Sequence, residues 1–286
     1  MTVRINQGSF QSNFMDKVER LYNLKIIKSK DRLEVYKYQL PQREGIEARN
    51  KDGRKGKSGE GASDEEAKII NRKKVLYKAR NKIIRLIYCN PMSTFITLTY
   101  KETPKDLKQS KEQLKRFFKK LQKDFKDLKY LYVLEFGSLN NRIHYHILCN
   151  IELPKNINFA KSNYKKNDKH KNFENEFNKK YWKRGFIDIR DLNKDGIKVI
   201  SKYVACYIVE DLLKLDIEGH KCYGYSKNLD KPMEEKLNTS DKIEDLLLLE
   251  QYDLKFINQY QIHYTNKINQ QISSNVNYFD YLKKED

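Results

Sequence analysis

Two histidines that stand two residues apart, His144 and His146, are the residues whose types and spacing most directly suggest chemistry. Their segment, residues 142–148, alternates as a β-strand does, so both imidazoles are expected on one face of a sheet. Two neutral imidazoles can bind a divalent metal ion if a third ligand joins them. Glu135 ends the preceding predicted strand of the same hairpin and is the expected third ligand. The alternative is a pair of ordinary surface histidines, which the nearby carboxylate makes the weaker interpretation.

Two tyrosines further along the chain, Tyr203 and Tyr207, could supply a nucleophile. They are four residues apart in a predicted helix over 198–215 and therefore share one face of it. A metal held by two histidines and a carboxylate can polarise a phosphodiester oxygen, and a tyrosine phenolate can attack phosphorus. The chain has 20 tyrosines, so packing in the core is the alternative for this pair. Only the combination with the histidines indicates phosphodiester chemistry.

The charge of the chain indicates a polyanionic partner. It holds 58 Lys and Arg against 39 Asp and Glu, a formal net charge of +19. The excess lies in residues 1–220, because residues 221–286 hold 9 basic and 11 acidic side chains. Such an excess favours nucleic acid as the partner, although the basic side chains of a helix can equally form a solvated face. The expected phosphate contacts are Arg142, Lys202, Lys73, Lys74, Lys78 and Arg80.

The sequence also indicates the compartment. It contains no segment of roughly 20 apolar residues, the length that a membrane span requires, and its first residues carry no apolar signal-peptide core. Its four cysteines lack the paired spacing of a metal site and are expected to be free thiols in a reducing environment. The predicted location is the cytoplasm, with no membrane partner.

The elements that must position the histidines and tyrosines are predicted from capping and periodicity. Ser63 and Glu66 have the spacing of a capping box, which predicts a helix from there to about residue 88. Alternation and apolar stripes predict the elements that follow. These are a strand at 94–100, a helix at about 105–127, and strands at 130–136 and 143–150. A short turn makes the last two strands an antiparallel hairpin, and the order predicts an α+β fold with helices packed on an antiparallel sheet.

Composition divides the chain into three predicted parts. Residues 1–62 form an N-terminal extension, in which residues 14–40 are a short helix followed by a strand, and a flexible basic linker completes it. Residues 63–230 form the main domain, which contains a polar, Lys- and Asn-rich insertion at 152–180. Residues 231–286 form a C-terminal extension of helix and strand.

Three motifs, in this order, resemble those of the HUH endonucleases, specifically the rolling-circle replication initiators of bacterial plasmids and single-stranded DNA phages. They are Phe95-Ile-Thr-Leu-Thr-Tyr100, His144-Tyr-His146 and Tyr203-Val-Ala-Cys-Tyr207. Supporting matches are Glu135-Phe-Gly137, Trp182 to Gly185, and Tyr225-Ser-Lys-Asn-Leu229. The resemblance spans about residues 70–230. Because the tyrosines follow the histidines, the motif order is that of replication initiators and some transposases, and differs from that of conjugative relaxases.

The resemblance implies a fold, a reaction and partners. The fold is a ferredoxin-like sheet with the histidines on a central strand and a helix that carries the tyrosines facing them. His144, His146 and Glu135 would bind Mg²⁺ or Mn²⁺. Tyr203 would join the 5′ phosphate of nicked DNA and release a 3′ hydroxyl, and Tyr207 would take the second transfer. Single-stranded or origin DNA is the implied substrate, and a host helicase and polymerase are the implied partners.

One departure from the family pattern leaves the roles of the two tyrosines open. Family members usually carry Lys three residues after the nucleophilic tyrosine, whereas Cys206 and Glu210 occupy those positions here. Lys202 or Lys214 is a candidate substitute. Two other functions also stay open: a single-strand transposase with the same chemistry, and a nucleic-acid-binding protein without catalysis.

Overall fold

The chain forms two compact units in a computed structural model that describes residues 20–44, 64–136, 142–160, 165–192, 222–241, 249–265 and 270–284. The first unit contains Met1–Lys28, Arg32–Lys57 and Glu234–Asp286. The second contains Ser29–Asp31 and Ser58–Met233. The N-terminal and C-terminal segments, which the sequence assigns to separate extensions, therefore lie together in one unit.

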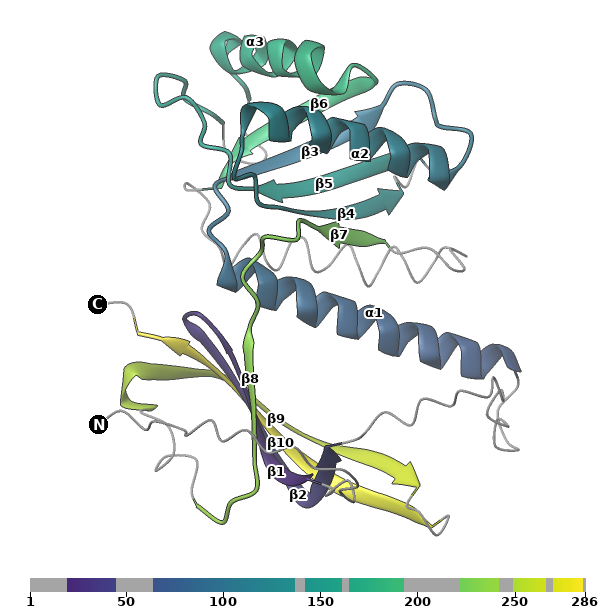
Figure 1. The fold of residues 1–286 in the computed structure, drawn as a ribbon, viewed down its shortest axis with the longest axis vertical. Coiled ribbons are helices and arrows are strands. Elements are labelled where there is room, and N and C mark those ends of the chain that lie inside the picture. Colours follow the sequence, from purple (N-terminus) through teal and green to yellow (C-terminus); the bar gives the residue numbers. More distant parts are fainter. Residues whose placement is uncertain are drawn as a thin grey trace, which may run out of the picture. The chain divides into compact units, whose positions relative to one another are not determined.

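The second unit is built on a five-stranded antiparallel sheet with the order β6-β3-β5-β4-β7 (Figure 1). Its strands are β3 (Thr94–Tyr100), β4 (Tyr130–Phe136), β5 (Ile143–Cys149), β6 (Gly185–Asp191) and β7 (Tyr223–Tyr225). The predicted α+β class is confirmed, and the two strands of the predicted hairpin are neighbours. Strand β5, which carries both histidines, is the middle strand of the sheet.

Two helices pack on opposite faces of this sheet. Helix α2 (Leu107–Asp124) begins at Asp106, whose side chain accepts a hydrogen bond from the Gln109 N–H. The apolar stripe of α2 joins a core with the side chains of one sheet face, among them Leu114, Phe117, Leu121, Ile96, Leu98, Tyr145 and Ile147. Helix α1 (Asp64–Cys89) packs on the other face, in a core that includes Leu76, Ile83, Leu86, Ile87, Leu131, Val133 and Leu148. Neighbouring residues along β5 alternate between these two cores, so His144 and His146 lie on the α1 side.

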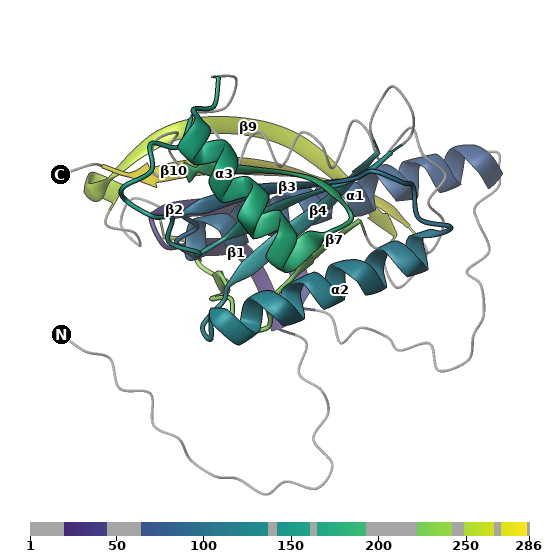
Figure 2. The ribbon, with the colours of Figure 1, turned by 90° about the horizontal axis from the view of Figure 1, so that it is seen from above.

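The polar insertion contains a helix that the sequence did not predict. Helix α3 (Asp168–Phe177) continues into one π-helical turn, Asn178–Trp182, and lies beside β6 at the edge of the sheet (Figure 2). Only its inward side chains are apolar or buried, which is why the composition of the segment indicated an irregular insertion.

A buried polar group joins α3 to the edge strand β6, and we name it the edge cluster: Lys166, His170, Glu174, Asp188 and Arg190. Glu174 accepts hydrogen bonds from the Ile189 N–H at 2.7 Å and from Lys166 Nζ at 2.6 Å. His170 is fully buried, and its Nε2 donates to the Ile189 carbonyl at 2.8 Å. These contacts satisfy the backbone groups of β6 that have no neighbouring strand, so the edge of the sheet is closed.

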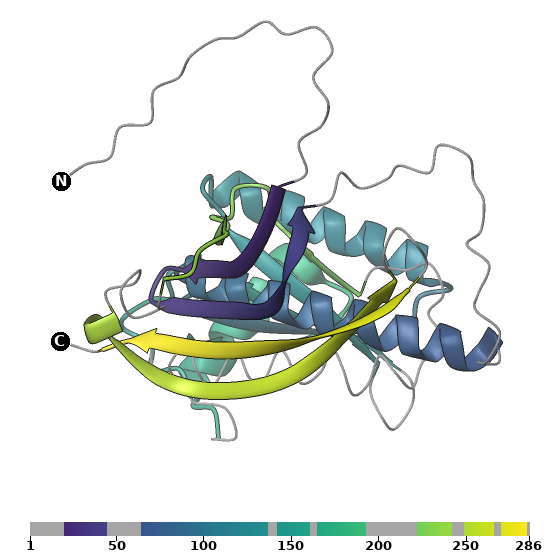
Figure 3. The ribbon, with the colours of Figure 1, turned by 90° about the horizontal axis from the view of Figure 1, so that it is seen from below.

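The first unit is built on a second five-stranded sheet, with the order β8-β1-β2-β10-β9 (Figure 3). The strands are β1 (Arg20–Ser29), β2 (Arg32–Glu44), β8 (Met233–Leu237), β9 (Tyr252–Thr265) and β10 (Gln271–Lys283). Strand β10 pairs antiparallel with β2, and a two-pronged ion pair of Arg32 with Asp280 at 2.9 Å connects them. The predicted helix before residue 33 is wrong for residues 20–29, which form β1.

The helices of the described ranges were compared with what a lipid bilayer demands. None of them combines the length and the apolar character that crossing a membrane requires.

Candidate active site

The histidine pair lies in register with polar residues of both neighbouring strands. On β3, Thr99 is the partner of His144 and Thr97 is the partner of His146. On β4, Glu135 is the partner of His144. Because register partners in an antiparallel sheet project to the same face, these five side chains form one polar group on the α1 side of the sheet.

Glu135 and His146 contact each other directly. The carboxylate Oε2 of Glu135 is hydrogen-bonded to Nε2 of His146, and the side chains are 17% and 6% exposed. Burial by itself raises the pKa of Glu135, but the hydrogen bond and the charge of His146 outweigh it, so the pKa lies below its usual value. Glu135 is therefore a carboxylate at neutral pH, as a metal ligand or an acceptor must be.

The two threonines hold the other ring nitrogen of each histidine. Thr97 Oγ1 lies 3.2 Å from Nδ1 of His146, and Thr99 Oγ1 lies 3.1 Å from Nδ1 of His144. Phe95 stacks on the His146 ring with centroids 5.6 Å apart. A second partner on Nδ1 fixes the orientation of an imidazole and leaves Nε2 for a ligand or a proton.

The roles of Thr97 and Thr99 were not predicted, although both lie in the first of the three motifs. The signal is in the sequence: Thr-Leu-Thr and His-Tyr-His have the same period of two, so antiparallel pairing of the two segments brings each threonine to one histidine. The spacing alone does not give the register, which needs the structure.

The surroundings of His144 favour its neutral form. Burial lowers its pKa below the ordinary value, and the charges of His146 and Arg142 lower it further against the opposing effect of Glu135. A neutral imidazole is the form that binds a metal ion.

The donor set fits a divalent metal ion in its chemistry, with two imidazoles and one carboxylate on a single sheet face. As they stand, however, no three His, Cys, Asp or Glu side chains among the described residues are arranged so that they could hold a metal ion. The reason at this site is the direct contact between Glu135 and His146, which occupies the Nε2 atom that would face the ion. Metal binding therefore requires the Glu135 side chain to turn away from His146.

The remaining predicted site residues divide into two groups. Arg142 is exposed at the start of β5 and lies near enough to act on the pKa of His144. On α1, the side chains of Lys73, Lys74 and Lys78 are exposed and that of Arg80 is partly buried. Lys202, Tyr203 and Tyr207 lie outside the described residues, as do Cys206, Glu210 and Lys214.

No curated protein and no solved structure shows a significant match to the chain. A family model does match, that of the replication-associated protein ORF2 family, over residues 93–209. The matched segment contains the strands that carry Thr97, Thr99, Glu135, His144 and His146, and it includes Tyr203 and Tyr207. This match assigns residues 93–209 to the replication-associated protein ORF2 family, consistent with the rolling-circle replication initiators that the three motifs resemble.

Proposed function

We propose that this replication-associated protein is a site-specific single-stranded DNA endonuclease and strand transferase of the HUH type that nicks origin DNA. The observation that carries the proposal is the polar group on the central strand: His144 and His146 share a face, Glu135 lies in register with them, and a threonine holds Nδ1 of each ring. A pair of ordinary surface histidines would not need oriented rings and a buried carboxylate between them.

The reaction follows from this group and from the tyrosines of the matched segment. The phenolic oxygen of Tyr203 attacks a phosphorus atom of the DNA backbone and loses its proton. The bond from phosphorus to the 3′ oxygen breaks, the 3′ oxygen takes up a proton, and the 5′ phosphate stays on the tyrosine. Tyr207 carries out the second transfer by the same exchange when the circle is closed. The free 3′ hydroxyl is the primer, so a host polymerase and a helicase act with the protein in the bacterial cytoplasm.

His144, His146 and Glu135 are the residues that would hold the metal ion. A bound Mg²⁺ or Mn²⁺ would stabilise negative charge on the phosphate oxygens, and two imidazole ligands suit Mn²⁺ better than Mg²⁺. Within the protein, the threonines fix the rings and keep Nε2 directed toward the site, while Glu135 supplies the negative charge.

A covalent adduct is the test of this function. The full chain is incubated with Mn²⁺ and a 3′-labelled single strand from the region next to its gene, and the products are separated under denaturing conditions. We expect a labelled protein band that is lost on treatment with EDTA and in the Tyr203→Phe, Tyr207→Phe double variant. Tyr77→Phe, at an exposed tyrosine of α1, is the control and keeps the band. An adduct that persists in the double variant would contradict the proposal.

The second candidate is a nucleic-acid-binding protein without catalysis. It is favoured by one observation, the direct contact of Glu135 with His146, because no three ligands of the described residues are arranged for a metal ion as they stand. This function predicts binding that weakens steeply with salt, and no cleavage with any divalent metal. The same incubation distinguishes the two candidates.

A further inference from the structure

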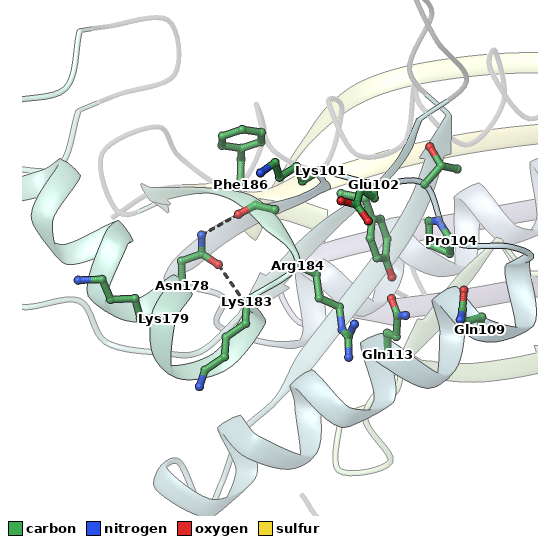
Figure 4. Close-up of a pocket in the computed structure, with 13 residues that line it drawn as sticks. Lys101, Glu102, Pro104, Gln109, Gln113, Asn178, Lys179, Lys183, Arg184 and Phe186 are labelled. Atoms are coloured by element: carbon green, nitrogen blue, oxygen red, sulfur yellow. Dashed lines mark hydrogen bonds between the residues drawn. The ribbon is translucent and has the colours of Figure 1, made fainter.

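An open pocket of about 810 Å³ lies where β3 and β6 end, beside the first turns of α2 and the π-helical turn (Figure 4). All of its lining residues belong to the second unit. We propose that this pocket binds one unpaired nucleotide of single-stranded DNA next to the histidine pair. The proposal rests on the proposed function, of whose substrate it names a subsite. The volume is within the range of pockets that bind small molecules and nucleotides.

The pocket is basic, and most of its charge is uncompensated. Of its thirteen lining residues, four are Lys or Arg and one, Glu102, is acidic. Lys101, Lys183 and Arg184 make no ion pair with any carboxylate in the part of the chain that the structure describes. Cations without a protein partner are available to phosphate groups, which supply most of the affinity of proteins for DNA.

An exposed aromatic side chain stands at the pocket on the same sheet face as the histidines. Phe186 on β6 is 63% exposed, is the register partner of Thr99, and through Thr99 lies in one row with His144. Two strand spacings separate Phe186 from His144, a distance of roughly 10 Å. A phenyl ring exposed to this extent contributes little to the core, but its flat face can stack against a base.

The turn that leads into Phe186 is held rigidly by its own residues. Asn178 Nδ2 donates to the Gly185 carbonyl at 2.7 Å, and the Lys183 N–H donates to Asn178 Oδ1 at 3.2 Å. Lys183 has a left-handed backbone with φ of 61°. A Cβ atom at Gly185 would lie 2.1 Å from the Thr99 carbonyl oxygen, so only glycine allows β6 this close to β3. The basic side chains of this turn are therefore positioned before any ligand arrives.

A side-chain amide that lines the pocket is not committed to a partner in the protein. The Oε1 atom of Gln113 is buried and has no hydrogen-bond partner among the described residues. Rotation of the amide group would present this oxygen, instead of the nitrogen, to a ligand. Such a group can accept a hydrogen bond from the amino group of a base.

The arrangement of these side chains selects a single strand. Phe186 and Lys101 stand together at one side of the pocket, and Arg184 and Gln113 lie at the other (Figure 4). We infer that a base stacks on Phe186 while its phosphate contacts Lys101. In a duplex both faces of a base are covered by its neighbours, so a duplex cannot use Phe186 in this way.

The test is a binding measurement on the full chain in EDTA, so that no cleavage occurs. Fluorescence anisotropy compares a short labelled single strand with the duplex of the same sequence. We expect Phe186→Ala to weaken single-strand binding about tenfold, with an unchanged salt dependence, and Phe186→Trp to restore it. Lys101→Ala should reduce the slope of log K against log salt by about 0.7, the value for one phosphate contact in a single strand.

Lys171→Ala is the matched control, because it removes the same charge from the same unit at a half-exposed lysine of α3 that does not line the pocket. It should leave both affinity and slope unchanged. Equal single-strand binding by Phe186→Ala and the wild type, or failure of Phe186→Trp to restore it, overturns the proposal. If Phe186 governs binding but the wild type forms no adduct with Mn²⁺, the pocket stands and the nicking function fails; the reverse result separates them in the other direction.

Discussion

The second unit contains two groups of histidine and acidic side chains, and they differ in what the protein leaves unsatisfied. In the edge cluster, His170 is fully buried, and its two ring nitrogens bond the Ile189 carbonyl and the Ala160 N–H. In the histidine pair, only Nδ1 of each ring is held by a threonine. The first group has no donor or acceptor left for a ligand, whereas the second keeps Nε2 directed at other side chains.

The positions of the two groups in the sheet explain this difference. The edge cluster satisfies the free backbone groups of β6, so its polar atoms replace a missing strand. The histidine pair is on the middle strand β5, whose backbone is paired on both sides, so its side chains are not needed to complete the sheet. Burial of His and Glu together does not by itself indicate function, and the useful criterion is which ring atoms remain uncommitted.

The largest expected effect separates the two histidines by activity. His146→Ala should reduce adduct formation with Mn²⁺ by roughly a thousandfold, because a lost metal ligand removes several kcal/mol of charge stabilisation. It should leave the midpoint of thermal unfolding nearly unchanged. His170→Ala, compared at equal amounts of folded protein, should keep its activity. Equal losses in the two variants would remove the distinction between the groups.

The next effect is on stability and runs in the opposite direction. His170→Ala should lower the free energy of unfolding by about 2 to 3 kcal/mol, because it leaves a cavity and two unsatisfied backbone groups. Urea unfolding followed by circular dichroism measures this change. A loss under about 0.5 kcal/mol would show that the edge cluster does not hold α3 to β6.

The threonines predict an intermediate effect on metal affinity. Thr97→Val and Thr99→Val should each weaken Mn²⁺ binding by about 10-fold to 100-fold, as loss of the group that orients a histidine ligand usually does. Thr→Ser at the same positions keeps the hydroxyl and should restore binding. Calorimetric titration with Mn²⁺ gives the affinity without reference to nicking. Unchanged affinity in both valine variants would mean that the hydroxyls do not orient the rings.

The smallest effect concerns pH. His144 has a lowered pKa in the folded protein, so the unfolded chain binds its proton more readily, and stability falls as the pH drops below about 6.5. Because the site is half-buried, the loss should stay under about 1 kcal/mol between pH 7 and pH 5. It appears as the difference between the wild type and His144→Gln in EDTA. The same pH dependence in both proteins would assign the effect to other groups.

Most of the main domain could be predicted from the sequence because its elements have strong periodic signals. The strand at 94–100 has the bounds that alternation predicts, and α2 ends within three residues of its expected end at 127. Residues 20–29 were misread as helix because short apolar segments fit either period, and pairing with β2 and β8 decides for a strand. Helix α3 was missed because few of its side chains are apolar.

The site was only partly predictable for a different reason. The histidines and Glu135 follow from spacing and from the hairpin, which are local in sequence. The contacts of Thr97 and Thr99 join residues more than forty positions apart and depend on strand register. The edge cluster likewise combines α3 with β6, and no local motif announces it.

The sheet of the first unit also bears on how the chain folds during synthesis. Every described strand of the second unit's sheet lies between residues 94 and 225, whereas β9 and β10 begin at residues 252 and 271 and complete the sheet that β1 and β2 start. A ribosome therefore releases all of these strands of the second unit before the first unit can close, and domains generally fold as they emerge. The hairpin of β1 and β2 must wait, unprotected along its β10 side, for more than two hundred residues of translation, which makes it the segment most dependent on chaperones.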